Sequence, residues 1–101
     1  MPLVKVTTLT ELPPGTLSEV QVAGAPYAVC NVDGAIHCVD GTCPHEGGPL
    51  GEGTLEGNNI TCPWHSFAFD CRTGANDMDE DLRVRSYPVV IQDGNILIDL
   101  P

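Results

Sequence analysis

Short apolar and β-branched runs, separated by Gly, Pro, Asn and Asp, make up most of the chain and predict an all-β fold. Two of these runs, residues 28–32 and 35–39, flank Asp33-Gly34, a pair that favours a tight β-hairpin. The arrangement recurs near the C-terminus, where residues 89–92 and 95–98 flank Asp93-Gly94. We therefore expect at least two antiparallel hairpins joined by short loops.

The middle of the chain has a different pattern. Residues 41–74 are rich in Gly, Cys and His, and a weaker hairpin is predicted there at Gly57-Asn58. No segment has a helical period, and residues 73–81 offer one short turn at most. We expect a single domain over residues 1–101, with a loop-rich insert of about residues 41–74 between two β-rich halves.

Length and charge restrict the function. A chain of 101 residues can bury one core, and its longest apolar run is too short to span a bilayer. Four basic and fourteen acidic residues give a formal charge of −10, which argues against nucleic-acid binding. The N-terminus does not resemble a secretory signal. We expect a soluble cytoplasmic monomer that binds neither nucleic acid nor membrane.

Two short clusters carry the chemistry, Cys43-Pro44-His45 and Cys62-Pro63-Trp64-His65. Sixteen residues, from Glu46 to Thr61, separate them. Together they offer two thiolates and two imidazoles, a ligand set that suits tetrahedral zinc or an iron–sulfur centre. The odd number of cysteines, five, favours metal ligands and free thiols over a disulfide framework.

The pattern Cys-x-His, sixteen residues, Cys-x-x-His resembles that of Rieske proteins, and the sequence CPHEGGPL at residues 43–50 resembles the soluble Rieske ferredoxins. The resemblance extends over nearly the whole chain. It implies an antiparallel all-β domain whose cluster-binding loops, 41–50 and 61–70, lie at one tip. It also implies one [2Fe–2S] cluster per chain, with Cys43 and Cys62 on one iron and His45 and His65 on the other.

The same resemblance implies a function. A soluble Rieske ferredoxin is an electron carrier without catalytic activity, and it passes single electrons from a flavin-dependent reductase to the terminal oxygenase of a ring-hydroxylating dioxygenase or monooxygenase system. The chain cannot be a Rieske oxygenase by itself. Of its three histidines, two would be cluster ligands, which leaves too few for the mononuclear iron of such enzymes.

Four positions depart from the high-potential Rieske proteins. Those proteins have a disulfide between the ligand loops, at positions that are Gly48 and Trp64 here, and a Ser and a Tyr at positions that are Phe67 and Phe69. Fewer donors to the cluster sulfurs stabilise its reduced form less. We expect a potential at the low end of the Rieske range of roughly −150 to +300 mV.

Three alternatives remain open. The small subunit of an assimilatory nitrite reductase has a similar domain and would also transfer electrons. A zinc-stabilised interaction module would use the same four ligands for a structural site. A redox sensor would change its binding to a partner with its oxidation state.

Other reactive residues have simpler interpretations. In the predicted hairpin Cys30 lies opposite His37, so Cys30 and Cys38 point to opposite faces and are poor disulfide partners. We interpret both as buried free thiols and His37 as a structural histidine. Cys71 is interpreted as a strand or turn thiol, with a redox-sensing role as the alternative.

Two further features lie near the proposed loops. The acidic run Asp77–Asp81 is interpreted as a solvated face, with docking to a basic partner as the alternative. Trp64, between two ligands, is expected to shield the cluster or to contact a partner.

Overall fold

The computed structural model describes residues 3–44, 47–64, 67–76 and 81–100 of the chain. Within these ranges the secondary structure consists of β-strands and one short 3₁₀ helix, which agrees with the predicted all-β class. In chain order the elements are β1 Leu3–Thr8, β2 Leu17–Val22, β3 Ala25–Val32, β4 Ala35–Asp40, η1 Leu50–Glu52, β5 Thr54–Glu56, β6 Asn59–Thr61, β7 Ala68–Asp70, β8 Ser86–Tyr87, β9 Val89–Gln92 and β10 Asn95–Asp99.

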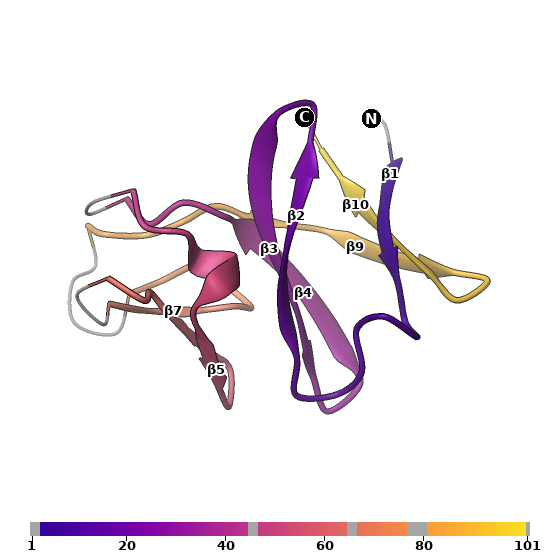
Figure 1. Cartoon of the computed structure of the whole chain (residues 1–101), viewed down its shortest axis with the longest axis horizontal. Coiled ribbons are helices and arrows are strands. Elements are labelled where there is room, and N and C mark those ends of the chain that lie inside the picture. The colour runs from indigo at the N-terminus through magenta and orange to yellow at the C-terminus, as the bar shows by residue number, and fades with distance from the viewer. Residues whose placement is uncertain (1–2, 45–46, 65–66, 77–80, 101) are drawn as a thin grey trace.

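The strands form three antiparallel sheets in two lobes. The sheets have the strand orders β1-β10-β9, β2-β3-β4-β8 and β5-β6-β7. The first two sheets make the larger lobe on the right of Figure 1, and the third, together with η1, makes the smaller lobe on the left. The smaller sheet lies in the chain between β4 and β8, which pair with each other. The predicted loop-rich middle segment thus has a hairpin sheet of its own.

The predicted turns form as expected. Asp33 and Gly34 have φ of 52° and 95°, and Asp93 and Gly94 have φ of 53° and 78°, so both pairs adopt the left-handed conformations of a type I′ turn. The weaker hairpin at Gly57 also forms, between β5 and β6. Local sequence chemistry therefore determines the register of these three hairpins.

The β3–β4 hairpin separates two hydrophobic cores. Cys30 pairs with His37, and Val29 pairs with Cys38, as predicted. Because successive side chains point to opposite faces, Cys30 packs into the core on the side of the smaller lobe, and Cys38 packs into the core against the β1-β10-β9 sheet. Both thiols are buried and free, as expected.

Asp40 joins the two ends of the segment that forms the smaller lobe. It is the last residue of β4, where the chain leaves the second sheet, and its carboxylate accepts hydrogen bonds from the Tyr87 hydroxyl at 2.6 Å and the Arg85 backbone N–H at 2.9 Å. Tyr87 lies in β8, where the chain rejoins the sheet. The Asp40 side chain therefore links the point where the chain leaves the second sheet to the point where it rejoins it.

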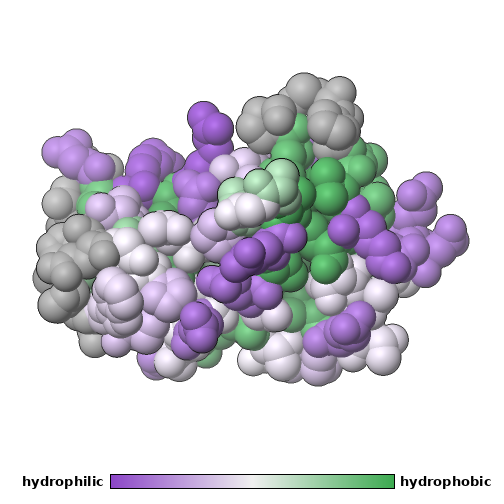
Figure 2. All heavy atoms as spheres, turned by 45° about the horizontal axis from the view of Figure 1, so that its top comes forward, coloured by the Kyte–Doolittle hydropathy of each residue, from purple (hydrophilic) through white to green (hydrophobic). Residues whose placement is uncertain are grey.

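The surface is mixed in character. In the view of Figure 2, hydrophobic residues gather on the half of the molecule that carries the larger lobe, whereas hydrophilic residues spread across both halves. Among the described residues, the exposed large hydrophobic side chains are those of Leu3, Leu9, Trp64, Val90 and Ile91. No helix in the described ranges is long and apolar enough to cross a membrane.

Candidate metal centre

Cys43 begins a closed loop between β4 and η1. Its N–H donates to the Gly48 carbonyl at 2.8 Å, and its own carbonyl accepts from the Gly47 N–H at 2.8 Å. Gly47 has φ of 77°, a conformation that few side chains tolerate. Just outside this loop Thr42 and Pro49 form an antiparallel bridge. The first predicted ligand loop is thus fixed by its own backbone hydrogen bonds.

Cys62 occupies the equivalent place in the second loop. It directly follows β6, and its N–H donates to the Phe67 carbonyl at 2.7 Å, one residue before β7 begins. The β6–β7 hairpin therefore holds the second ligand loop at its end. Neither β7 nor this closing bond was predicted, because backbone pairing of so short a strand leaves no distinct pattern in the sequence.

The two cysteines meet although eighteen residues separate them in the chain. Each is only 2% exposed, and both belong to the same hydrophobic core. Burial raises the pKa of the Cys62 thiol; the backbone at Trp64 opposes this shift, and the neighbouring Cys43 adds to it. The thiols of Cys43 and Cys62 are thus buried together between the two ligand loops.

Gly48 and Trp64 pack the two loops against each other. A Cβ at Gly48 would lie 2.7 Å from the Cys62 sulfur and 3.2 Å from the nearest atoms of the Trp64 ring. No side chain fits at Gly48 unless the second loop moves. Trp64 is nevertheless 49% exposed, so one part of the ring covers Gly48 and another part faces solvent.

The predicted histidine ligands lie outside the described residues. His45 and His65 fall in the gaps at 45–46 and 65–66. Of the acidic run only Asp81 is described, and it is exposed. Within the described ranges, no three His, Cys, Asp or Glu side chains are grouped as a metal site. The structure therefore brings together the two cysteines of the predicted ligand set and does not test the two histidines.

The phenylalanines near the second loop provide no hydroxyl. Phe69 is fully buried in the same core as Cys43 and Cys62, and Phe67 packs against this core. The surroundings of the two thiols on this side are thus apolar.

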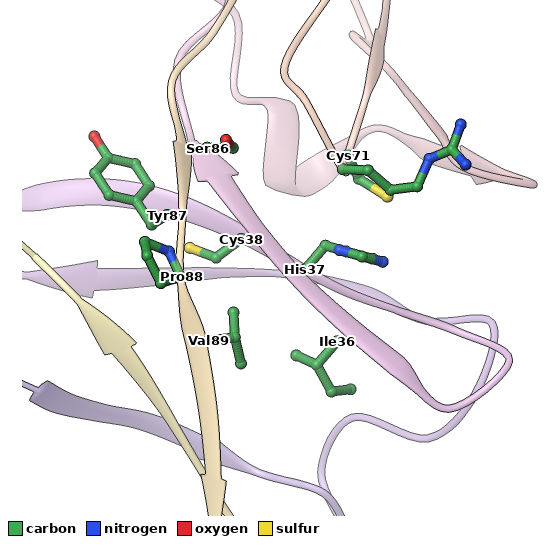
Figure 3. Close-up of a pocket in the computed structure, with 9 residues that line it drawn as sticks. Ile36, His37, Cys38, Cys71, Ser86, Tyr87, Pro88 and Val89 are labelled. Carbon is green, nitrogen blue, oxygen red and sulfur yellow. The ribbon is translucent and has the colours of Figure 1, made fainter.

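The third histidine, His37, is half-buried and lines a separate cavity of about 380 Å³ together with Cys38, Cys71 and Tyr87 (Figure 3). Burial lowers the pKa of His37, with a smaller contribution in the same direction from Arg72. The imidazole is therefore held towards its neutral form, as expected for a structural histidine.

Comparisons with known proteins agree with this arrangement. The Rieske [2Fe–2S] domain family matches residues 3–88. The ferredoxin component of the naphthalene 1,2-dioxygenase system of Pseudomonas aeruginosa is 35% identical over 98 residues, which cover 96% of this chain and 94% of the relative.

Solved structures show the same fold over the full length. The ferredoxin of carbazole 1,9a-dioxygenase from Nocardioides aromaticivorans has a TM-score of 0.91 at 31% identity, with 100% of both chains covered. A second match comes from the complex of reduced oxygenase and oxidized ferredoxin in carbazole 1,9a-dioxygenase. It has a TM-score of 0.88 at 30% identity, over 98% of this chain and 97% of the other.

The predicted likeness to nitrite reductase small subunits holds for the fold alone. The structure described as a small subunit of an NADH-dependent nitrite reductase from Mycobacterium tuberculosis has a TM-score of 0.88 at 22% identity, over 99% of this chain and 96% of the other. The family model and the ferredoxin relative, in contrast, are sequence matches that cover most of the chain. This chain belongs to the Rieske [2Fe–2S] domain family.

Proposed function

We infer that the chain is a Rieske-type ferredoxin, an electron carrier that transfers one electron at a time and catalyses no reaction itself. The observation that carries this conclusion is the burial of the Cys43 and Cys62 thiols in one core, each presented by a loop closed by its own backbone hydrogen bonds. The full-length similarity to ferredoxin components of dioxygenase systems supports the same function.

The proposed ligands of the [2Fe–2S] cluster are Cys43, His45, Cys62 and His65. The described part of the site fits this cluster, because two thiolates on one iron require two cysteines side by side in a place shielded from water. When bound, the cluster accepts and returns one electron, and its two imidazole ligands raise its reduction potential above that of an all-cysteine cluster.

The protein around the thiols has two tasks. Phe69 and the Trp64–Gly48 contact limit the access of water to the sulfurs. The outer side of both loops remains open, because Pro44, Pro63 and Trp64 are exposed. A partner can therefore approach the tip of the smaller lobe closely, which short-range electron transfer requires.

The proposed partners are a flavin-dependent reductase as donor and the terminal oxygenase of a multicomponent system as acceptor. One of the similar solved structures is a complex of reduced oxygenase and oxidized ferredoxin.

The formal charge of −10 favours partners with basic docking surfaces and disfavours self-association, which supports a monomer. Five free cysteines suit the reducing cytoplasm, where we place the chain.

The test is EPR spectroscopy of the dithionite-reduced protein, with iron and acid-labile sulfide measured on the same sample. We expect a Rieske-type signal and about two irons per chain. His65→Ala should lose this signal, and His37→Ala, which removes the histidine outside the motif, should keep it. A Rieske signal that persists in His65→Ala would overturn the ligand assignment, and a colourless protein with one zinc would favour the zinc-stabilised module.

A nitrite reductase small subunit remains a second candidate because that fold is also similar. The two functions differ in their partner. Co-purification with a large sirohaem subunit would favour nitrite reductase, whereas reduction by a flavin reductase and turnover of an oxygenase would favour the ferredoxin. A redox sensor would bind its partner differently in the two oxidation states and support no turnover.

A further inference from the structure

Two cysteines outside the proposed ligand set lie at the junction between the lobes. Cys30 belongs to β3 in the larger lobe, and Cys71 directly follows β7 in the smaller lobe. Both belong to the same hydrophobic core, with exposures of 0% and 1%. Their sequence separation of 41 residues gave no reason to pair them, and only the packing of the two sheets brings them together.

The two thiols are neighbours. Cys30 is paired with His37 across the β3–β4 hairpin, and His37 lines one cavity together with Cys71. Each of the two thiols also shifts the pKa of the other. Cys38 is not part of this pair, because it faces the other core. Figure 3 shows its sulfur directed towards Pro88 and Tyr87, away from Cys71.

Their proximity makes the two sulfurs unequal. The interaction with Cys30 lowers the pKa of Cys71, and the same interaction together with burial raises the pKa of Cys30. Cys71 is therefore the sulfur that ionises first, and a thiolate is the nucleophilic form of cysteine. Cys30 remains protonated beside it.

Cys71 is held in place and lines a cavity that a small molecule can enter. Its N–H donates to the Asn58 carbonyl at 2.8 Å, and the next residue, Arg72, bonds to the Asp70 carboxylate. Cys71 and His37 also line the cavity of about 380 Å³ shown in Figure 3. A peroxide is far smaller than this cavity, so it can reach the cavity wall to which Cys71 contributes.

We propose that Cys30 and Cys71 form a redox-active dithiol site, whose substrate is a hydroperoxide and whose product is a disulfide that joins the two lobes. The Cys71 thiolate attacks the peroxide, the O–O bond breaks, and Cys71 becomes a sulfenic acid while water or an alcohol leaves. The Cys30 sulfur then attacks Cys71, the S–S bond forms and a water leaves. Two thiols lose two electrons and two protons in total, and the peroxide gains both.

The disulfide would cross-link β3 to the end of β7, across the interface that sets the smaller lobe on the larger one. The bond closes a loop that contains both proposed ligand loops, and such a loop restricts the unfolded chain. Formation of the bond brings these two neighbouring sulfurs of one core to about 2.05 Å. The oxidised protein is therefore expected to be the more stable form.

The purified protein with its cluster is treated with a small excess of hydrogen peroxide, denatured in the presence of an alkylating agent and digested without reduction. Trypsin is unsuitable, because the sequence has no Lys or Arg between Lys5 and Arg72 and all five cysteines stay in one peptide. Cleavage before Asp separates them into residues 1–32, 33–39, 40–69 and 70–76. We expect peptide 1–32 linked to peptide 70–76, a link that dithiothreitol reverses.

Variants and stability provide the second readout. The link should be absent in Cys30→Ala and in Cys71→Val and should form normally in the matched control Cys38→Ala. Oxidation should raise the Tm of the wild type by about 5 °C or more, and it should leave the Tm of Cys71→Val unchanged. Mapping in the wild type does not depend on whether any variant folds.

Three results would overturn the proposal. The thiols of Cys30 and Cys71 could remain alkylatable after the peroxide has been consumed. The disulfide could instead lie within peptide 40–69, which would place it between Cys43 and Cys62 after loss of the cluster. Peptide 70–76 could also carry an irreversible sulfinic acid without any link to peptide 1–32.

Discussion

The sulfur of Cys62 lies 2.7 Å from the position that a Cβ of Gly48 would occupy, so one proposed ligand loop is built against the backbone of the other. Gly48 needs no unusual backbone angle, unlike its neighbour Gly47. Space alone therefore excludes a side chain at this position. The tightness of the contact makes the position of the Cys62 sulfur depend on a residue fourteen positions earlier.

Gly48→Ala tests this dependence. The added methyl group must displace the Cys62 sulfur or the Trp64 ring, and overpacking of this kind costs about 1–3 kcal/mol. We expect lower stability in chemical denaturation and a clear loss of iron per purified chain. The control is Glu52→Ala, an exposed position in the same lobe. Full iron content and wild-type stability in Gly48→Ala would show that the loops are not packed as described.

Trp64 is the single tryptophan of the chain and packs beside a proposed ligand, so its fluorescence reports on the metal centre. An absorbing cluster close to the indole should quench its emission. We expect emission to rise severalfold when the cluster is removed with acid and a chelator, and to fall again on reconstitution. The variant Trp64→Phe gives the background from tyrosine. Emission that does not change on metal removal would place the cluster away from Trp64.

The hydrogen bond from Tyr87 to Asp40 should make stability depend on alkaline pH. Burial and the adjacent Asp40 carboxylate raise the pKa of Tyr87 above its ordinary value near 10. A raised pKa in the folded state means that the stabilisation is complete below pH about 10 and is lost as the pH rises further. The free energy of unfolding should thus fall above pH about 10.

Tyr87→Phe should weaken this dependence and cost about 1.5–3 kcal/mol at neutral pH, because it removes a hydrogen bond to a charged group. The matched control is Tyr27→Phe. The Tyr27 ring packs edge-on against Tyr87 with 5.3 Å between centroids, and its hydroxyl bonds to no described residue. Equal losses in the two variants, measured by urea denaturation at several pH values, would argue against the Asp40 bond.

How far the fold can be predicted from sequence depends on the turns. The Asp-Gly pairs predicted two hairpins correctly, because Asp and Gly both adopt positive φ. The β2–β3 hairpin had no such signal. Its turn is Ala23-Gly24, with φ of 53° and 83°, and Ala is unusual in that conformation. The backbone pairing of β2 with β3 holds Ala23 in this conformation, so strand pairing prevails over the conformational preference of the turn residue.

Sequence spacing identified the cysteines of the candidate site but could not show how they meet. Cys43 and Cys62 stand out because each opens a Cys-Pro motif with a histidine nearby. Cys30 and Cys71 have no motif, and their contact arises from the packing of β3 against the smaller lobe. Contacts between distant residues of this kind require the fold to be known.

Phe69 offers a test of the redox properties. It is fully buried in the core that contains Cys43 and Cys62, and it has no hydroxyl to donate to a sulfur. A donor to the sulfurs would favour the reduced cluster, which carries more negative charge. We therefore expect a midpoint potential below about +100 mV, towards the low end of the Rieske range. A higher value, measured by protein-film voltammetry, would contradict this explanation.

The variant Phe69→Tyr introduces the missing hydroxyl, and Phe69→Leu controls for the change in packing. A hydrogen bond to a charged group contributes about 1.5–3 kcal/mol, which for one electron corresponds to about 65–130 mV. If the hydroxyl reaches a sulfur, the potential of Phe69→Tyr should rise by up to this amount, and that of Phe69→Leu should not rise. Equal shifts in both variants would show that packing around the thiols, and not hydrogen bonding, sets the potential.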